Sequence, residues 1–154
     1  MLKSFGLTGR NDYKVDSKGR INLPARMRKI LAPNTYDEVV ISMSSKGHLS
    51  VFNKDYWVST IQQNIINRVD TVENIENWDA IQRAIHRLSE NSHMSTVDSQ
   101  GRINVPGWLL EKAGITKEVV VVGAVDRVSI WAPDRYAKWL DKEGDDSSLT
   151  GIYI

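Results

Sequence analysis

The chain has 154 residues, of which 41% are apolar and 25% charged, a balance typical of a soluble globular protein with one domain or two small ones. It contains no cysteine, which excludes a disulfide scaffold, a thiol nucleophile and thiolate metal sites. No apolar stretch approaches the roughly 20 residues of a membrane span, and residues 1–10 lack the apolar core of a signal peptide. We therefore expect an intracellular protein.

The basic side chains are concentrated near the N-terminus. The formal net charge is only +1, but residues 1–57 carry +5, residues 58–91 carry −2, residues 92–136 are neutral and residues 137–154 carry −2. The first 36 residues alone contain eight basic side chains against two acidic ones. Because a polyanion responds to local potential rather than to net charge, this region is the predicted contact surface for an anionic partner.

The first elements of the chain follow from local patterns. Apolar and polar residues alternate over 13–15 and 21–23, which predicts two short strands. The sequence Asp-Ser-Lys-Gly at 16–19 is typical of a turn, since aspartate accepts hydrogen bonds from the amides that follow it and glycine adopts a positive φ. Pro24 suits the first position of a helix, which we expect over residues 25–31.

Two further strands and a pair of helices come next. The apolar stretches 39–43 and 49–52 predict a hairpin. The apolar period then changes to 3.6 residues, and Asn53 is a suitable cap for the helix that follows. A second helix is predicted between Trp78 and Leu88. Residues 13–52 therefore form a β-β-α-β-β module, followed by helices.

The module occurs twice. Residues 15–24 (VDSKGRINLP) recur as residues 97–106 (VDSQGRINVP), with eight of ten positions identical. Two shorter matches follow in the same order, 38–41 with 118–121 and 49–52 with 128–131. Three ordered matches indicate two copies of one unit of about 45 residues, and a unit this small needs its twin to bury an apolar face.

The second copy predicts the same elements. We expect a helix over 107–113 that ends at Gly114, strands over 119–122 and 128–131, and a last helix over 135–142. The acidic tail, 141–148, is expected to be solvated, and residues 152–154 could pack locally. The chain thus divides into module 1 (10–57), a helical connector (58–91), module 2 (92–136) and a short helix with an acidic tail (137–154).

An aspartate and an arginine frame the turn in each copy, Asp16 with Arg20 in turn 1 (residues 16–20) and Asp98 with Arg102 in turn 2 (residues 98–102). One interpretation is a structural ion pair, which when exposed contributes about 0–1 kcal/mol. The other is that the turn presents a fixed guanidinium to a phosphate or a guanine edge. We assign both roles to Arg20, which lies among many basic residues, and a structural role to Arg102, because module 2 is neutral.

The paired motif, together with GITKEVVVVG at 114–123, resembles the MraZ family of bacterial transcriptional regulators, built from two SpoVT/AbrB-like modules. The resemblance covers roughly residues 7–140, and one departure is Gln100, where a lysine would be expected. It implies a mainly β fold with peripheral α-helices (α+β), in which tandem AbrB-like modules form a double-split, swapped-hairpin β-barrel.

The resemblance also implies a function. Members assemble into rings and bind short G-rich direct repeats in double-stranded DNA upstream of the division and cell-wall gene cluster, usually repressing it. We accordingly expect a nucleoid-associated, cytoplasmic homo-oligomer with no cofactor, metal, membrane or small-molecule substrate. The DNA-contacting arginine of the family falls at Arg20, with Lys18 as its basic neighbour. The candidate DNA-binding residues, in order of rank, are Arg20, Lys18, Lys14, Arg10, Arg26 and Arg28.

Structural roles compete with contact for several of these residues. Arg26, Arg28 and Lys29 could simply form a solvated helix face. Arg10 could shield an edge strand from pairing with other chains. Trp57, Trp131 and Trp139 are predicted to lie in the core, whereas Trp108 could pack either at a subunit interface or in the core.

Two other classes of function, an enzyme and a scaffold, compete with DNA binding. Asp16 and Asp98 could meet as a catalytic dyad, but an arginine four residues after each would hold it ionised. The three histidines, His48, His86 and His93, lack metal-ligand spacing, so we predict no enzyme. A ring-forming scaffold without specific DNA binding is the alternative, but a scaffold has no need to place its positive charge in one module.

Overall fold

The computed structural model describes residues 6–34, 36–70 and 75–142. Both modules contain the five elements expected from the repeat. Module 1 consists of β1 (Arg10–Lys14), β2 (Arg20–Asn22), α1 (Ala25–Leu31), β3 (Glu38–Met43) and β4 (Leu49–Asn53). Module 2 consists of β5 (Ser92–Thr96), β6 (Arg102–Asn104), α5 (Gly107–Lys112), β7 (Glu118–Gly123) and β8 (Val128–Trp131).

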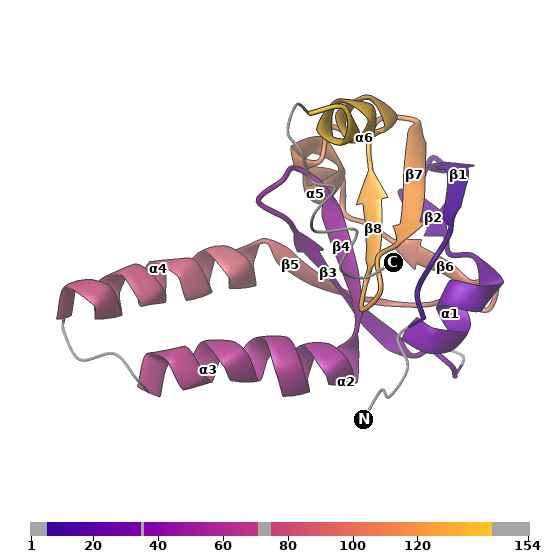
Figure 1. The fold of residues 1–154 in the computed structure, drawn as a ribbon. Helices are drawn as coiled ribbons and strands as arrows, with labels where there is room; N and C mark the ends of the chain where they lie inside the picture. The colour runs from indigo at the N-terminus through magenta and orange to yellow at the C-terminus, as the bar shows by residue number, and fades with distance from the viewer. Residues whose placement is uncertain (1–5, 35, 71–74, 143–154) are drawn as a thin grey trace, which may run out of the picture.

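Helices connect the modules. The side chain of Asn53 accepts a hydrogen bond from the amide of Tyr56, 3.0 Å away, and so caps α2 (Lys54–Tyr56). This helix continues through a π-helical segment, η1 (Trp57–Gln62), into α3 (Gln63–Asp70), and α4 (Ile75–Glu90) leads back to the sheet. In Figure 1 the α3 and α4 helices project together from one side of the sheet. None of the helices in the described ranges is both long and apolar enough to cross a bilayer.

The strands of the two modules are exchanged. The larger sheet has the order β1-β7-β8-β4-β3-β5, and β2 pairs with β6 in a separate ribbon of two strands. Thus β1 pairs with β7 of module 2, and β5 pairs with β3 of module 1. Turns 1 and 2 form as the sequence predicts, but the strands on either side of each turn pair with the other module. The fold is the expected α+β combination of an antiparallel sheet with peripheral helices.

One core serves both modules because of this exchange. Ile21 of β2 lies directly opposite Ile103 of β6, and both are fully buried. Met27 of α1 and Leu109 of α5 are also fully buried, at positions related by the repeat. Neither module therefore has an apolar core of its own, which is why the unit occurs in two copies.

The last helix, α6 (Pro133–Leu140), begins two residues earlier than predicted because Pro133 occupies its first turn. Trp131 is 2% exposed, as expected for a core residue, but Trp139 is 45% exposed. The prediction that Trp139 is buried was wrong, since its ring stacks on Trp131 at 4.9 Å and covers the core from outside. Trp57 is half-buried and Trp108 exposed. Most of the predicted acidic tail, from residue 143 onwards, lies outside the described residues.

Candidate nucleic-acid interface

Turn 1 holds the Arg20 side chain in place. Asp16 Oδ1 accepts hydrogen bonds from the backbone amides of Lys18 and Arg20, both at 2.9 Å, and Asp16 Oδ2 accepts one from Arg20 Nε at 2.5 Å. Gly19 completes the turn with a φ of +79°, a conformation that glycine adopts readily. The Arg20 side chain keeps 30% of its surface exposed, so it is both held by Asp16 and partly open to solvent.

Turn 2 repeats this geometry. Asp98 Oδ1 accepts from the amides of Gln100 and Arg102, both at 2.9 Å, and Asp98 Oδ2 accepts from Arg102 Nε at 2.8 Å. The Arg102 side chain is 21% exposed, and its Nη1 lies 4.0 Å from Asp16 Oδ2. Asp16 is therefore the point where the two turns meet electrostatically, since it faces a guanidinium from each module.

Both aspartates are held ionised. The hydrogen bond from the Arg20 amide lowers the pKa of Asp16, and the Arg20 side chain lowers it further against the opposing effect of burial. Burial raises the pKa of Asp98, but hydrogen bonds from the amide and side chain of Arg102 outweigh it, so that this pKa too lies below its ordinary value. A carboxylate dyad that shares a proton requires one raised pKa. These side chains therefore act as anchors for arginine.

The ribbon of β2 and β6 carries four polar side chains on one face. Because successive side chains of a strand point to opposite sides, Arg20 and Asn22 lie on the face opposite the buried Ile21. Arg102 and Asn104 lie likewise opposite Ile103 in β6. The register places Arg20 opposite Asn104, and Asn22 opposite Arg102. Neither asparagine is among the residues predicted to bind DNA, although strand alternation alone places each on the same face as an arginine.

Each turn is supported by the other module. Gly19 O accepts a hydrogen bond from Val105 N, and Gly101 O accepts one from Leu23 N, both at 2.9 Å. The side chain of Arg28 in α1 lies directly over Gly101, where any Cβ would overlap its guanidinium. At the position equivalent to Arg28 in the repeat, Leu110 of α5 packs over Gly19. Turn 2, whose tip carries Gln100 where turn 1 has Lys18, thus has a cation from module 1 beside it.

Two other predicted contact residues lie on β1. Lys14 is exposed at the end of the strand, opposite Glu118 of β7. Arg10 pairs with Asp12 at 3.0 Å, and its guanidinium lies 5.5 Å from the ring centre of Tyr136. Since β1 is an edge strand of the larger sheet, Arg10 is placed equally well to shield this edge or to contact a ligand.

The remaining basic residues of α1 have different environments. Arg26 Nη2 donates a hydrogen bond to Thr8 O at 2.8 Å and packs over Gly9, so it ties the segment before β1 to the helix. Lys29 is exposed, and no hydrogen bond or ion pair of its side chain is found within the described part of the chain. Arg26, Arg28 and Lys29 are neighbours in sequence, but only Arg28 reaches a turn.

Among the residues that the structure describes, no group of three or more His, Asp or Glu side chains could hold a metal ion. His48 is buried and stacks on Trp131 with 4.0 Å between the ring centres. Burial lowers the pKa of His48 to about 4, with a further contribution from the nearby Arg127.

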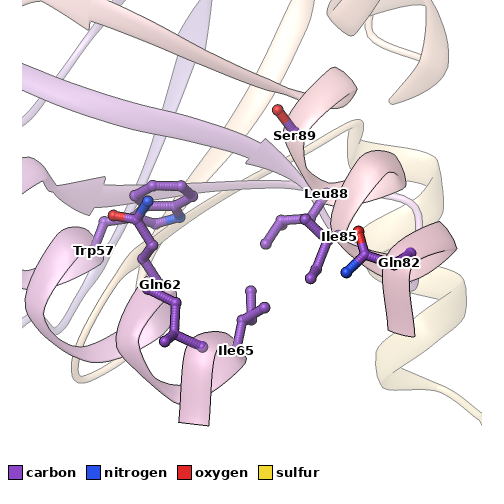
Figure 2. A pocket seen from close by; sticks show the side chains of 8 residues that line it. Trp57, Gln62, Ile65, Gln82, Ile85, Leu88 and Ser89 are labelled. Atoms are coloured by element: carbon purple, nitrogen blue, oxygen red, sulfur yellow. The ribbon is translucent and has the colours of Figure 1, made fainter. Parts of the chain in front are cut away.

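An apolar pocket of about 350 Å³ lies between the connecting helices, away from both turns. Figure 2 shows Ile65 of α3 pointing towards Ile85 and Leu88 of α4, with the Trp57 indole at one end. The polar residues among those that line it are Gln62, Gln82 and Ser89. The pocket is therefore the seam between two amphipathic helices rather than part of the interface.

Comparison with known proteins agrees with this architecture. The model of a family described as "MraZ protein, putative antitoxin-like" matches residues 7–79 and 88–150. Each matched segment contains one of the two turns.

Curated relatives match most of the chain and carry the name Transcriptional regulator MraZ. The protein from Christiangramia forsetii is 32% identical over 144 residues, which cover 92% of this chain and 88% of that protein. The protein from Heliobacterium modesticaldum is 32% identical over 139 residues, which cover 87% of this chain and 86% of that protein. The protein from Spiroplasma kunkelii is 31% identical over 127 residues, or 82% of each chain. The chain belongs to the MraZ family.

Proposed function

We propose that this chain is a sequence-specific, DNA-binding transcriptional regulator that contacts double-stranded DNA through turn 1. The observation that carries the proposal is the side chain of Arg20, which is anchored through Nε by an ionised Asp16 and is still partly exposed. The relatives named as transcriptional regulators support the same class of function.

The geometry suits recognition of a guanine or a phosphate. With Nε bonded to Asp16, the terminal amino groups of Arg20 remain for a ligand, and an arginine can donate two hydrogen bonds to O6 and N7 of guanine. Because the carboxylate already fixes the side chain, little conformational freedom is lost on binding. Lys18, exposed at the tip of the turn, supplies a point charge for the phosphate backbone. Lys14, Arg10, Arg26 and Arg28 extend the positive surface.

The finer proposal is that the protein acts as a homo-oligomeric ring on G-rich direct repeats in its own promoter. It would repress the division and cell-wall gene cluster there, without catalytic activity, in the cytoplasm at the nucleoid. Repeated sites suit a ring, because each weak contact gains from the effective concentration that its neighbours create.

The test compares Arg20→Ala and Arg20→Lys with wild type on DNA from upstream of the gene. We expect Arg20→Ala to abolish specific binding in a gel-shift assay. Arg20→Lys, which keeps the charge but lacks the planar fork, should retain only non-specific binding. Circular dichroism and light scattering should show unchanged folding and assembly. Lys46→Ala removes an exposed cation from the turn between β3 and β4 and is the matched control, which should bind normally.

Two results would contradict the proposal. If Arg20→Ala binds the promoter like wild type, turn 1 does not contact DNA. If the wild-type protein forms rings but does not bind the promoter at all, the scaffold alternative is correct.

A further inference from the structure

The outer face of the β2–β6 ribbon has the composition of a base-reading surface. It carries Arg20, Asn22, Arg102 and Asn104, two arginines and two asparagines in a diagonal arrangement. Both asparagines are exposed, while the opposite face of the ribbon is anchored in the core by two fully buried isoleucines. The ribbon is therefore a rigid element that presents polar side chains to solvent.

The asparagine amides are available to a ligand. Within the described ranges, the only hydrogen bonds found for Asn22 and Asn104 outside the strand ladder involve backbone atoms, such as Asn104 N, which donates to Ser95 Oγ at 3.0 Å. An asparagine that serves structure normally caps a helix or closes a turn with its side chain, as Asn53 does here. Among the residues that the structure describes, neither ribbon asparagine is found to cap a helix or to close a turn with its side chain.

The dimensions of the ribbon match those of DNA. The major groove admits a two-stranded β-ribbon, in which arginine pairs with guanine and asparagine pairs through two hydrogen bonds with adenine N6 and N7. Side chains two residues apart on one strand are separated by about 6.7 Å, close to the spacing of two base pairs at roughly 3.4 Å each. Arg20 and Asn22 can therefore address bases about two positions apart, and Arg102 and Asn104 can do the same from the antiparallel strand.

We propose that Asn22 and Asn104 are specificity-determining residues that read adenine in the major groove, on one ribbon face shared with Arg20 and Arg102. This inference rests on the proposed function, and it extends the contact surface from turn 1 to both modules. It also gives Arg102, to which the sequence assigns a structural role, the same relation to DNA as Arg20. A duplex site for this protein thus contains A·T pairs at fixed distances from its guanines.

The experiment measures binding of the full-length protein to the promoter fragment and to a set of fragments in which each base pair is changed in turn. Wild type should discriminate against the wrong base at a few positions by about 5- to 150-fold each. Asn22→Ala should abolish discrimination at one A·T pair and leave the other positions unchanged. Asn104→Ala should do the same at a different A·T pair. The salt dependence of affinity should not change, since no charge is removed.

Controls separate base reading from other roles. Asn34→Ala, which removes an exposed asparagine outside the ribbon, should leave the whole preference profile unchanged. Asn22→Ser keeps a polar side chain but cannot form two hydrogen bonds to adenine, so it should behave like Asn22→Ala. Thermal melting should show that each variant is as stable as wild type, as expected for exposed side chains.

The inference fails if Asn22→Ala and Asn104→Ala keep the wild-type profile, or if they weaken binding equally to every sequence. The proposed function would still stand in both cases, provided that Arg20→Ala abolishes specific binding. If Arg20→Ala has no effect, or wild type shows no sequence preference, the proposed function itself is wrong and the inference falls with it.

Discussion

At the scale of single residues, two glycines show how the same turn is packed in different ways. Gly19 and Gly101 have nearly identical φ angles, +79° and +78°. A Cβ on Gly19 would lie 2.6 Å from the backbone oxygen of Val105, whereas at Gly101 the obstacle is the flexible end of Arg28. The chain thus contains a matched pair in which backbone strain is equal and the neighbour differs.

Gly19→Ala should therefore destabilise the protein more than Gly101→Ala. The left-handed backbone conformation costs each alanine about 1–2 kcal/mol. At Gly101 the Arg28 side chain can rotate away from the new methyl group. At Gly19 the obstacle is the backbone carbonyl of Val105, which can move only if the strand itself shifts. Urea unfolding of the two variants measures the difference, and equal losses of unfolding free energy would show that the carbonyl contact does not resist displacement.

The buried His48 makes stability depend on pH. Its pKa is about 4 in the folded protein, against about 6.5 for an unperturbed histidine. At a pH between these two pKa values, His48 is protonated in the unfolded chain but neutral in the folded one. The free energy of unfolding therefore decreases as the pH falls through this range. We expect a loss of about 3 kcal/mol from this group between pH 7 and pH 4.

His48→Phe should remove this part of the pH dependence, because phenylalanine can stack on Trp131 and does not titrate. Carboxylates also make both proteins less stable at acidic pH. The test therefore compares how much the free energy of unfolding in urea changes between pH 7 and pH 4.5 in wild type and in the variant. His86→Phe, at an exposed position, is the control and should follow wild type. Parallel pH profiles for wild type and His48→Phe would mean that His48 is hydrated in the folded state.

At the scale of elements, Asn53 links β4 and α1 of module 1 to the first of the connecting helices. It is the last residue of β4, its Oδ1 caps α2, and its Nδ2 donates to Leu31 O at the end of α1, 2.8 Å away. One side chain thus satisfies an amide at a helix start and a carbonyl at a helix end, both of which lack partners in the helices themselves. The connecting helices are oriented from this point.

Asn53→Ala should lower the free energy of unfolding by about 1–2 kcal/mol, since both hydrogen bonds are lost. Asn53→Ser should lose less, because serine can still cap α2 although it is too short to reach Leu31. Chemical denaturation followed by circular dichroism gives both values. If alanine and serine are equivalent, the cap contributes nothing and the bond to Leu31 carries the effect.

At the scale of the whole molecule, strand exchange makes the two modules one folding unit. Each short strand of the central ribbon comes from a different module, and the buried pair Ile21 and Ile103 joins them. No boundary within the described modules separates one core from another. A destabilising substitution in the core of either copy should therefore lower the stability of the entire chain.

Ile21→Ala and Ile103→Ala should each cost about 2–5 kcal/mol, and each variant should still unfold in one transition. Far-UV circular dichroism and tryptophan fluorescence should give coincident curves. The double variant should deviate from additivity, because the two residues lie opposite each other in the ribbon and are buried in the same core. Two separate transitions in either single variant would show that the modules unfold independently.

Local chemistry was predictable from the sequence, and long-range pairing was not. The Asp-Ser-Lys-Gly turn, the helix after Pro24 and the Asn53 cap each depend on residues within a few positions of one another. A strand has the same alternation of apolar and polar residues whichever strand it pairs with. The pairing of β1 with β7 rather than β2 could therefore not be predicted from the pattern, and only the family resemblance implied an exchange of strands. The π-helical segment has no explanation in its sequence.

The candidate site shows the same division. The sequence placed Asp16 and Arg20 together because four residues separate them. It could not place Arg28 over Gly101, since this contact requires knowledge of the exchange. The net charge of each module is also misleading here, because Arg28 is encoded in module 1 but lies against turn 2. By contrast, alternation within β2 is enough to place Asn22 on the same face as Arg20, because the two residues are two positions apart on one strand.

The side chains of Arg28 and Leu110 make the surroundings of the two turns chemically different. In a symmetric pair of separate subunits both turns would be encoded once and would be chemically identical. Here the copies are joined in one chain and have diverged, so one turn is overlaid by a hydrocarbon and the other by a guanidinium. Each turn still has one cation beside it, but Lys18 belongs to turn 1 itself, whereas Arg28 reaches turn 2 from a helix of the other module. The two ends of the ribbon are therefore chemically distinguishable, and the repeat in the sequence does not produce an exact two-fold symmetry at the turns.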